Sequence, residues 1–286
     1  AFDGAWDVHG TACSRETLLA MGQGVEVPEG SVSNQPYSVF MDIYAAMSRA
    51  HMRTYGSTQA QIAAVSAKNH VHSTHNPLAQ YRKPYTVEAV LAAPPIVFPL
   101  TLPMCSPISD GAAAAVICNS AGLRKLAVSD DRAIRVLASV LQTSAERDPY
   151  DYDRHVTRLA AMRAYAMAGL GPLDVDVAEV HDATAMGEII EIEALGLVPP
   201  GEGGIAAERG DTVIGGRIPV NPSGGLECKG HPIGATGLGQ IYELVSQLRG
   251  DAGARQIEGA RVAVAQNGGG VLGVEEAVVA VTILGR

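Results

Sequence analysis

His231 is the residue of this chain that best fits a catalytic base. It lies in the segment 221–237, in which Pro232 follows it directly and glycines occupy positions 224, 225, 230, 234 and 237. Glycine allows turns that a side chain would block, and proline fixes one backbone torsion, so we expect a rigid turn before a helix. Imidazole titrates near neutral pH and can take and return a proton. A lone histidine is more often a hydrogen-bonded core residue, but these surroundings favour proton transfer.

Two further segments place polar or glycine residues after predicted strands. His181 and Asp182 follow a strand predicted at 175–180, and residues 268–270 are glycines that follow another at 261–265. With the Gly-His-Pro at 230–232, these segments resemble the signature blocks of the thiolase superfamily. The His-Asp pair resembles the His-Asp-Cys-Phe block of sterol-carrier-protein-2-type thiolases. Segments at 68–70, 76–77, 109–114 and 247–253 are also similar, so the resemblance runs from about Tyr37 onward in the family's order.

The resemblance implies a role for each of five residues. His231 would activate a nucleophilic cysteine and help to bind the thioester oxygen. His181 would add to the polar environment of that oxygen, and the N–H of Gly268 would be a second oxyanion donor, a contact that contributes on the order of 3 kcal/mol. Ser223 and Gly224 would contact coenzyme A, which is a substrate here, and no bound cofactor is expected. The plainer alternatives are that His181 caps the adjacent helix and that Gly268 forms an ordinary turn.

The second thiol that such enzymes use as acid and base is missing from its usual places. The resemblance would put it at position 183 or 266, where this chain has Ala183 and Gln266, and neither moves protons at neutral pH. Cys228 is the only thiol near the signature, and we expect it to be a small buried residue. Residues 1–31 match no nucleophile motif either. We therefore expect the nucleophilic cysteine outside this chain, on a longer or a separate N-terminal polypeptide.

Three functions are compatible with these matches and gaps. The first is an acyltransferase that cleaves 3-oxoacyl-CoA with coenzyme A, or runs the reverse Claisen condensation. The second is an aldolase or lyase of the same fold, which cleaves an acyl-CoA side chain without an acyl-enzyme. The third is a non-catalytic subunit. The resemblance further implies a homo-oligomer and, in some members, a partner protein with an OB-type domain that helps to hold coenzyme A.

The order of predicted elements indicates a layered α/β protein. Helices are predicted at 41–52, 58–72, 85–92, 154–168, 186–195 and 234–248. Strands are predicted at 96–102, 134–140, 175–180, 261–265 and 277–284, and the small apolar run 110–119 is predicted to be a buried strand. By resemblance to the αβαβα thiolase fold, residues 1–107 form a loop region that covers coenzyme A, residues 108–132 end an incomplete N-terminal half, and residues 133–286 form the C-terminal domain.

Composition limits the classes of binding partner and the cellular compartment that we expect. The formal net charge of −9 argues against a nucleic-acid partner. Pro94, Pro95 and Pro99 interrupt the longest apolar stretch, so no membrane span is predicted. The four cysteines form no Cys-x-x-Cys pair, which indicates reduced thiols, and residues 283–286 are no peroxisomal address. We therefore expect a cytoplasmic protein.

Three other patterns are set aside on their spacing. The histidines of the segment 70–75 do not share a helix face at the spacing of the zinc helix motif, so no metal site is expected. Residues 234–239 carry their glycines out of the dinucleotide-loop order. The acidic residues of the helix at 186–195 lack basic partners four positions on, and we expect them on a solvated face. They are Glu188, Glu191 and Glu193.

Overall fold

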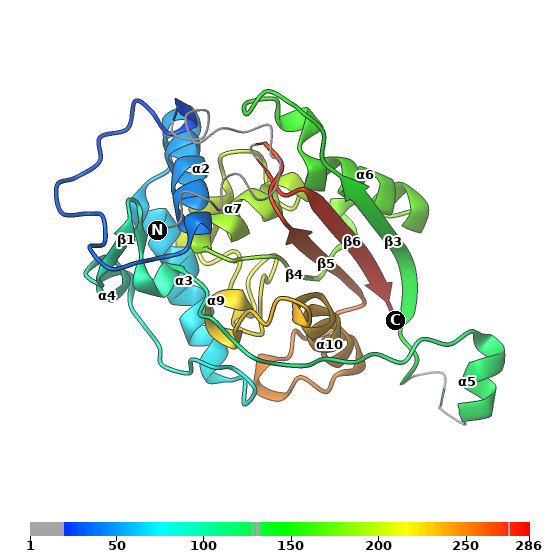
Figure 1. Ribbon diagram of the computed structural model, residues 1–286. Helices are drawn as coiled ribbons and strands as arrows, with labels where there is room; N and C mark the ends of the chain where they lie inside the picture. The colour runs from blue at the N-terminus through cyan, green and yellow to red at the C-terminus, as the bar shows by residue number, and fades with distance from the viewer. Residues whose placement is uncertain (1–19, 127–128, 130–131, 274) are drawn as a thin grey trace.

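A four-stranded sheet forms the centre of the protein in a computed structural model, which describes residues 20–126, 129, 132–273 and 275–286 (Figure 1). The strands lie in the order β3 (Arg135–Thr143), β6 (Val278–Gly285), β5 (Val262–Gly269), β4 (Val177–Glu179). Strand β6 is antiparallel to both neighbours, and β4 is parallel to β5. Because β4 is short, β5 continues past its end and leaves an open edge there.

Helices cover both faces of this sheet. Side chains alternate between the faces along a strand. On one face Val264 of β5 packs in a cluster with α6 (Val156–Ala168), and on the other face Ala263 packs in a cluster with α10 (Thr236–Arg249). Helix α7 (Ala185–Ala194) joins the first cluster to a third one, which it shares with the N-terminal helices. The predicted layered α/β architecture is therefore confirmed.

Helices α2 and α3 lie where the sequence predicts helices, although α2 extends beyond both predicted ends and α3 extends beyond its predicted C-terminal end. Helix α2 (Val39–Tyr55) ends at Gly56, which has the left-handed φ of 75°. Helix α3 (Gln59–Thr74) begins with a capping box, in which Thr58 accepts from the N–H of Gln61 and the Gln61 side chain accepts from the N–H of Thr58. These local signals fix the two helices that pack against α7.

The remaining elements are short. They are α4 (Val87–Leu91), β1 (Pro95–Val97), β2 (Leu100–Thr101), η2 (Leu102–Met104), α5 (Ser120–Leu126), η4 (Tyr152–Arg154), η5 (Pro172–Asp174), α8 (Gly203–Glu208), α9 (Gly225–Lys229) and η6 (Gly253–Arg255). Strands β1 and β2 form a separate small sheet.

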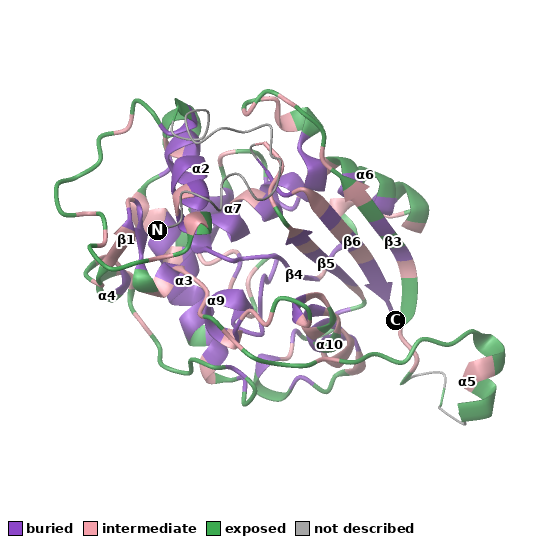
Figure 2. Ribbon diagram, viewed as in Figure 1, coloured by how far each residue is buried: buried purple, intermediate pink, exposed green. Residues whose placement is uncertain are grey.

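The prediction of a buried strand at residues 110–119 is wrong. This segment has no regular structure, and Val116 and Ile117 are each 85% exposed. It runs past α10 towards α5 as an extended, mostly exposed trace (Figures 1 and 2). A strand with small apolar side chains is buried only where neighbouring strands pair with it, and none of the described strands does so.

The prediction of a solvated acidic face on α7 is also wrong, because Glu188, Glu191 and Glu193 are all buried (Figure 2). Glu188 pairs with the ammonium group of Lys68, and Glu193 lies 3.0 Å from the Nε2 atom of His51. These partners come from α3 and α2, more than a hundred positions away, so a search within the helix could not find them.

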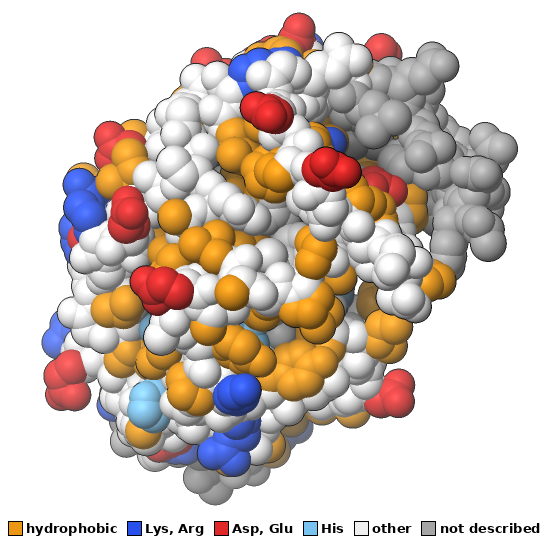
Figure 3. Space-filling view, turned by 90° about the vertical axis from the view of Figure 1, so that its left-hand side faces the viewer, with side chains coloured by type: hydrophobic (Ala, Val, Ile, Leu, Met, Phe, Trp, Pro, Cys, Tyr) orange, Lys and Arg blue, Asp and Glu red, His pale blue; other side chains and the backbone are white. Residues whose placement is uncertain are grey.

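The surface over α4, β1 and the preceding loop is mixed in character. Figure 3 shows apolar side chains in several groups between scattered basic and acidic ones on this face. Among the exposed apolar residues of this part of the chain are Val32, Phe40 and Leu102. In the described part of the chain, no helix has the length and hydrophobicity needed to cross a membrane.

Candidate active site

His231 lies on a turn between α9 and α10 that the surrounding glycines make possible. Gly230 has a φ of 109°, and a Cβ atom there would lie 2.7 Å from the hydroxyl oxygen of Ser109. That same hydroxyl accepts from the N–H of His231 at 3.1 Å. The carbonyl of Pro232 then accepts from the N–H groups of Ala235 and Thr236, which starts α10. The histidine therefore has a fixed backbone, as predicted.

The hydrogen bonds around the ring assign a role to each ring nitrogen. The Nδ1 atom of His231 lies 2.7 Å from the hydroxyl oxygen of Thr236, and this hydroxyl donates to the carbonyl of Pro232 at 3.1 Å. A hydroxyl has one hydrogen to donate, so we assign the tautomer in which Thr236 accepts from Nδ1–H and the Nε2 atom keeps a free lone pair. Burial, and then the nearby Lys229, lowers the pKa of His231. The ring is thus a neutral base near pH 7.

His181 faces His231 across the site. The two ring centroids are 5.0 Å apart at an interplanar angle of 75°. The backbone N–H of His181 donates to the Oε1 atom of Gln266 at 2.9 Å, and the buried Nδ1 atom has no partner among the described residues. Burial, and then His231, lowers the pKa of His181 to about 3, so this ring is neutral as well. It does not cap α7, because the hydroxyl of Thr184 accepts from the first turn of that helix.

The N–H of Gly268 points away from β6. Arg261 accepts from the N–H of Arg286, so it belongs to a hydrogen-bonded pair of the β5–β6 ladder. Such pairs alternate along antiparallel strands, and Gly268 lies an odd number of residues further along an unbroken register. Its N–H is therefore directed to the other side of β5, past the short β4. This orientation suits an oxyanion donor, and the role itself stays a prediction.

Ser223 and Gly224 do not join the two histidines. Both are buried, and Ser223 donates to Glu179 through its N–H at 3.0 Å and through its hydroxyl at 2.8 Å. A Cβ atom on Gly224 would lie 2.6 Å from the Cβ of Ser73, so this glycine is needed for close packing. Contact with coenzyme A through these two residues stays a prediction, and their internal hydrogen bonds do not favour it.

A buried carboxylate cluster lies behind the histidines, and sequence analysis missed it. The side-chain amide of Asn69 donates to Asp182, Glu188 and Glu227 at 3.2, 3.1 and 3.0 Å. Asp182 also accepts from the N–H of Leu226 at 2.7 Å, which ties the residue after His181 to the helix before His231. This cluster therefore holds both catalytic candidates in one frame. Asp182, Glu188 and the segment that contains Asn69 were each noted in the sequence for other reasons, but they come from separate elements, so no pattern indicated that they meet.

A cavity of about 900 Å³ opens beside the His231 turn. Its walls come from residues 108–114 on one side and from α10 on the other. Ser109, Lys229, Pro232, Thr236 and Tyr242 contribute to the lining. A substrate that reached His231 from this side would meet Lys229 as the basic group of the lining, and Asp110 and Glu243 as its acidic groups.

Two of the described thiols, Cys228 and Cys105, are poorly suited to act as a nucleophile. Cys228 is fully buried, and burial, followed by the nearby Glu227, raises its pKa, so its expected role as a small buried residue is confirmed. Burial likewise raises the pKa of Cys105. Cys118 lies on the exposed segment, and Cys13 lies outside the described residues.

The histidines of the segment 70–75 are used inside the protein. The Nδ1 atom of His72 lies 3.0 Å from the carbonyl of Asn221, and its Nε2 atom accepts from the N–H of Ile214 at 3.1 Å. The Nε2 atom of His70 lies 3.3 Å from the carbonyl of Pro103. With both nitrogens of His72 engaged, these residues do not form a shared metal-binding point.

Comparison with known proteins gives a consistent result. The family described as Thiolase C-terminal domain-like matches residues 138–286. Acetyl-CoA acetyltransferase of Methanothermobacter thermautotrophicus is 46% identical over 82% of this chain and 61% of that protein. Sterol carrier protein 2 of Bos taurus is 40% identical over 85% of this chain and 46% of that protein. The solved Ltp2-ChsH2(DUF35) aldolase matches with a TM-score of 0.68 at 23% identity, over 86% of this chain and 63% of that one.

The chain thus spans between 46% and 61% of the length of these two curated relatives. The family match lies within the predicted C-terminal region 133–286, and the domain boundaries themselves stay predictions. The family match and the identity to the acetyltransferase and to sterol carrier protein 2 together show that the chain belongs to the thiolase superfamily, with its sterol-carrier-protein-2-type members.

Proposed function

We propose that this chain supplies the catalytic base of a thiolase-type acyltransferase that cleaves 3-oxoacyl-CoA with coenzyme A, or runs the reverse condensation. The observation that carries the proposal is the pair of facing neutral histidines. Thr236 holds the Nδ1–H of His231 and leaves the Nε2 atom as an acceptor. The nucleophilic cysteine lies outside this chain in this proposal.

One histidine can manage the protons of the whole cycle. The Nε2 atom of His231 takes the thiol proton, and the thiolate attacks the 3-oxo carbon while the N–H of Gly268 stabilises the oxyanion. The bond between C2 and C3 breaks, and the protonated His231 returns its proton to C2 of the departing enolate. The neutral ring then takes the thiol proton of coenzyme A, which attacks the acyl-enzyme, and returns it to the released cysteine.

A second candidate is a lyase that acts on an acyl-CoA side chain. The absence of the second thiol favours it, because Gln266 and Ala183 occupy the two positions at which thiolases carry that thiol. The amide of Gln266 is engaged on both sides, by the N–H of His181 and the hydroxyl of Thr157. In this reaction His231 would take the proton of a 3-hydroxyl group, the bond between C2 and C3 would break, and the proton would return to C2. The likeness to the Ltp2-ChsH2(DUF35) aldolase agrees with this candidate at the level of fold.

Intact mass spectrometry of the full-length protein separates the two candidates. Incubation with acetoacetyl-CoA is expected to add one acetyl group to a cysteine, and later addition of coenzyme A is expected to remove it. Release of an aldehyde or ketone from a 3-hydroxyacyl-CoA without any covalent adduct would instead establish the lyase. If the protein is folded by circular dichroism but catalyses neither reaction, the result would point to the non-catalytic subunit.

The partners belong to the same proposal. Acyl-CoA is the proposed small-molecule partner, and a homo-oligomer, an OB-domain protein and a separate N-terminal polypeptide are the proposed protein partners. The similarity to an aldolase solved together with a DUF35 component supports a search for such a protein partner. The cytoplasmic location expected from sequence stays a prediction.

A further inference from the structure

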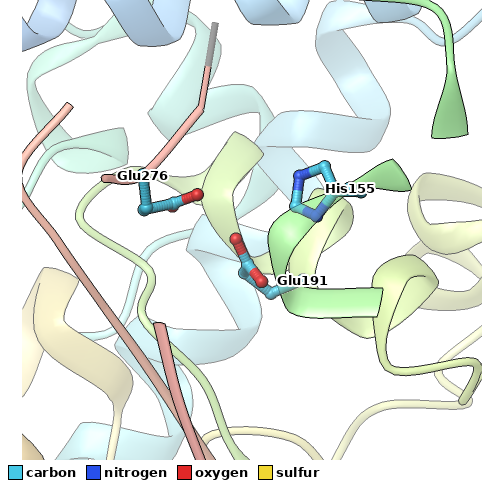
Figure 4. A group of neighbouring side chains, drawn as sticks. All are labelled: His155, Glu191 and Glu276. Atoms are coloured by element: carbon cyan, nitrogen blue, oxygen red, sulfur yellow. The ribbon is translucent and has the colours of Figure 1, made fainter. Parts of the chain in front are cut away.

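A second buried cluster of polar side chains lies on the opposite face of the sheet from α10. His155 stands at the N-cap of α6, Glu191 lies on α7, and Glu276 comes just before β6. Figure 4 shows the three side chains arriving from these separate elements around one space. One ligand atom from each residue lies within 4.8 Å of the others. The function proposed above makes no use of this cluster.

Several atoms of this cluster make no hydrogen bond of ordinary geometry within the part of the chain that the structure describes. They are the Nε2 atom of His155, both carboxylate oxygens of Glu191 and the Oε2 atom of Glu276. The three residues are 4%, 1% and 6% exposed, so water at the surface does not solvate them. A buried polar group without a partner costs about 1–3 kcal/mol, and more when it is charged. Glu191 interacts with the Thr157 hydroxyl and with the Glu276 carboxyl, and both contacts act on its pKa, so the polar groups at the centre of the cluster are satisfied only in part.

Among the described residues, the nearby basic side chain is already paired. Arg147 is already bound to Glu275, with 2.7 Å between its Nε atom and the carboxylate. Two glutamate side chains and one imidazole, bound in their deprotonated forms, are a ligand set that suits a divalent transition metal.

We propose that His155, Glu191 and Glu276 bind one divalent transition-metal ion. The ion would displace the protons that burial favours on Glu191 and Glu276, whose pKa values are both raised, and would give a partner to the Nε2 atom of His155. This departs from the expectation of no metal site, which rested on the histidines at 70–75. The new ligands are far apart in sequence, so no spacing motif could indicate them.

The cluster adjoins a cavity through which an ion could enter, and a bound ion would also affect the end of β5. His155 also lines a cavity of about 100 Å³ together with Arg147, Tyr150 and Tyr152, so the cluster adjoins an accessible space. A Cβ atom on Gly268 would lie 2.5 Å from the Cγ of Glu276. An ion that fixes Glu276 would therefore also fix the end of β5 that carries the proposed oxyanion donor.

Ligation has one identifiable cost. The Nδ1 atom of His155 accepts from the N–H of Thr157 at 3.3 Å, so the metal-free ring carries its proton on Nε2. Metal binding at Nε2 moves this proton to Nδ1. The long, weak hydrogen bond from the N–H of Thr157, which caps α6, is then lost. The side chains must also close in, because first-row metals bind nitrogen and oxygen at about 2.0–2.2 Å.

Titration of the chelator-treated full chain with Co²⁺, followed by absorption spectroscopy and calorimetry, tests the proposal. We expect one equivalent to bind, and Zn²⁺ to displace it. Glu276→Gln and Glu191→Gln keep the shape of each side chain and should weaken binding by at least the roughly 10- to 100-fold that even outer-shell changes cost. His75→Ala removes an exposed histidine and is the matched control, with unchanged binding expected.

Thermal unfolding provides the second measurement. Saturating Zn²⁺ should raise the melting temperature of the wild type and of His75→Ala, and much less that of the glutamine variants. The absence of saturable binding, or equal binding by the wild type and both glutamine variants, would overturn the proposal. In that event the two carboxyl groups share protons instead. Neither result depends on which reaction the enzyme catalyses.

Discussion

At the scale of single residues, the site depends on the different tasks of the two ring nitrogens of His231. Thr236 accepts from Nδ1–H only because its own hydroxyl donates to Pro232. A free imidazole distributes its proton between both nitrogens, whereas this one keeps Nε2 as the acceptor. His181, which is also neutral, adds a polar group without placing a positive charge beside the base.

Thr236→Val tests this assignment. Loss of the hydroxyl removes the acceptor of Nδ1–H and the hydrogen bond that stabilises the imidazolium. We expect kcat/KM to fall by about 10-fold or more, since a hydrogen bond to a charged group contributes roughly 1.5–3 kcal/mol. Thr236→Ser keeps the hydroxyl and should retain most of the activity. Equal kinetics for the valine and serine variants would show that the hydroxyl does not orient the ring.

At the scale of elements, buried carboxyl groups join α3, α7 and α9 behind the site. Asn69 of α3 donates to Glu188 of α7 and to Glu227 of α9. Burial is the main cause that raises the pKa of Glu227 to about 8, and Glu188 raises it further. The elements that position His231 are thus held by a carboxyl group that stays protonated at neutral pH.

The protonation of Glu227 predicts how stability depends on pH. The folded protein holds this proton up to about pH 8, whereas the unfolded chain loses it near the ordinary value of 4.5. The free energy of unfolding should therefore fall as the pH rises from about 5 to 8. The glutamine side chain of the Glu227→Gln variant can accept from Asn69 but cannot ionise. The free energy of unfolding of this variant should therefore fall less over this pH range. Urea unfolding at four pH values checks this, and parallel curves for both proteins would contradict it.

At the scale of the whole molecule, the exposed run 110–119 is the feature that sequence and structure describe differently. Its apolar side chains lie in the open, although the same pattern elsewhere in the chain forms buried strands such as β5. The chain spans only part of the length of its relatives, and partners for this run are absent from the described residues.

Aspartate substitutions test whether residues 110–119 are exposed, as in the structure, or buried, as the sequence predicts. Val116→Asp at the exposed site should change the free energy of unfolding by less than about 0.5 kcal/mol. Val140→Asp in β3, where the valine is 4% exposed, should cost about 3 kcal/mol or more, because it buries an unpaired charge. Chemical denaturation of both variants gives the comparison. A large cost at Val116 would mean that this run is packed in solution.

Sequence reasoning succeeded where the signal is local and failed where it depends on distant contacts. Gly56 and Thr58 mark helix ends through their own backbone and side-chain chemistry, and both marks are confirmed. The glycines around His231 likewise indicated its turn. The burial of Glu191 and the contact between the rings of His181 and His231 depend on how elements pack, so no pattern within one segment could supply them.

The most direct test of the central claim is the turnover of full-length His231→Ala protein in the acetoacetyl-CoA cleavage assay. If His231 is the base, kcat should fall by roughly 10²- to 10⁴-fold, with unchanged circular dichroism and melting temperature. Turnover within a few-fold of the wild type would contradict the account and place the proton transfer on another residue.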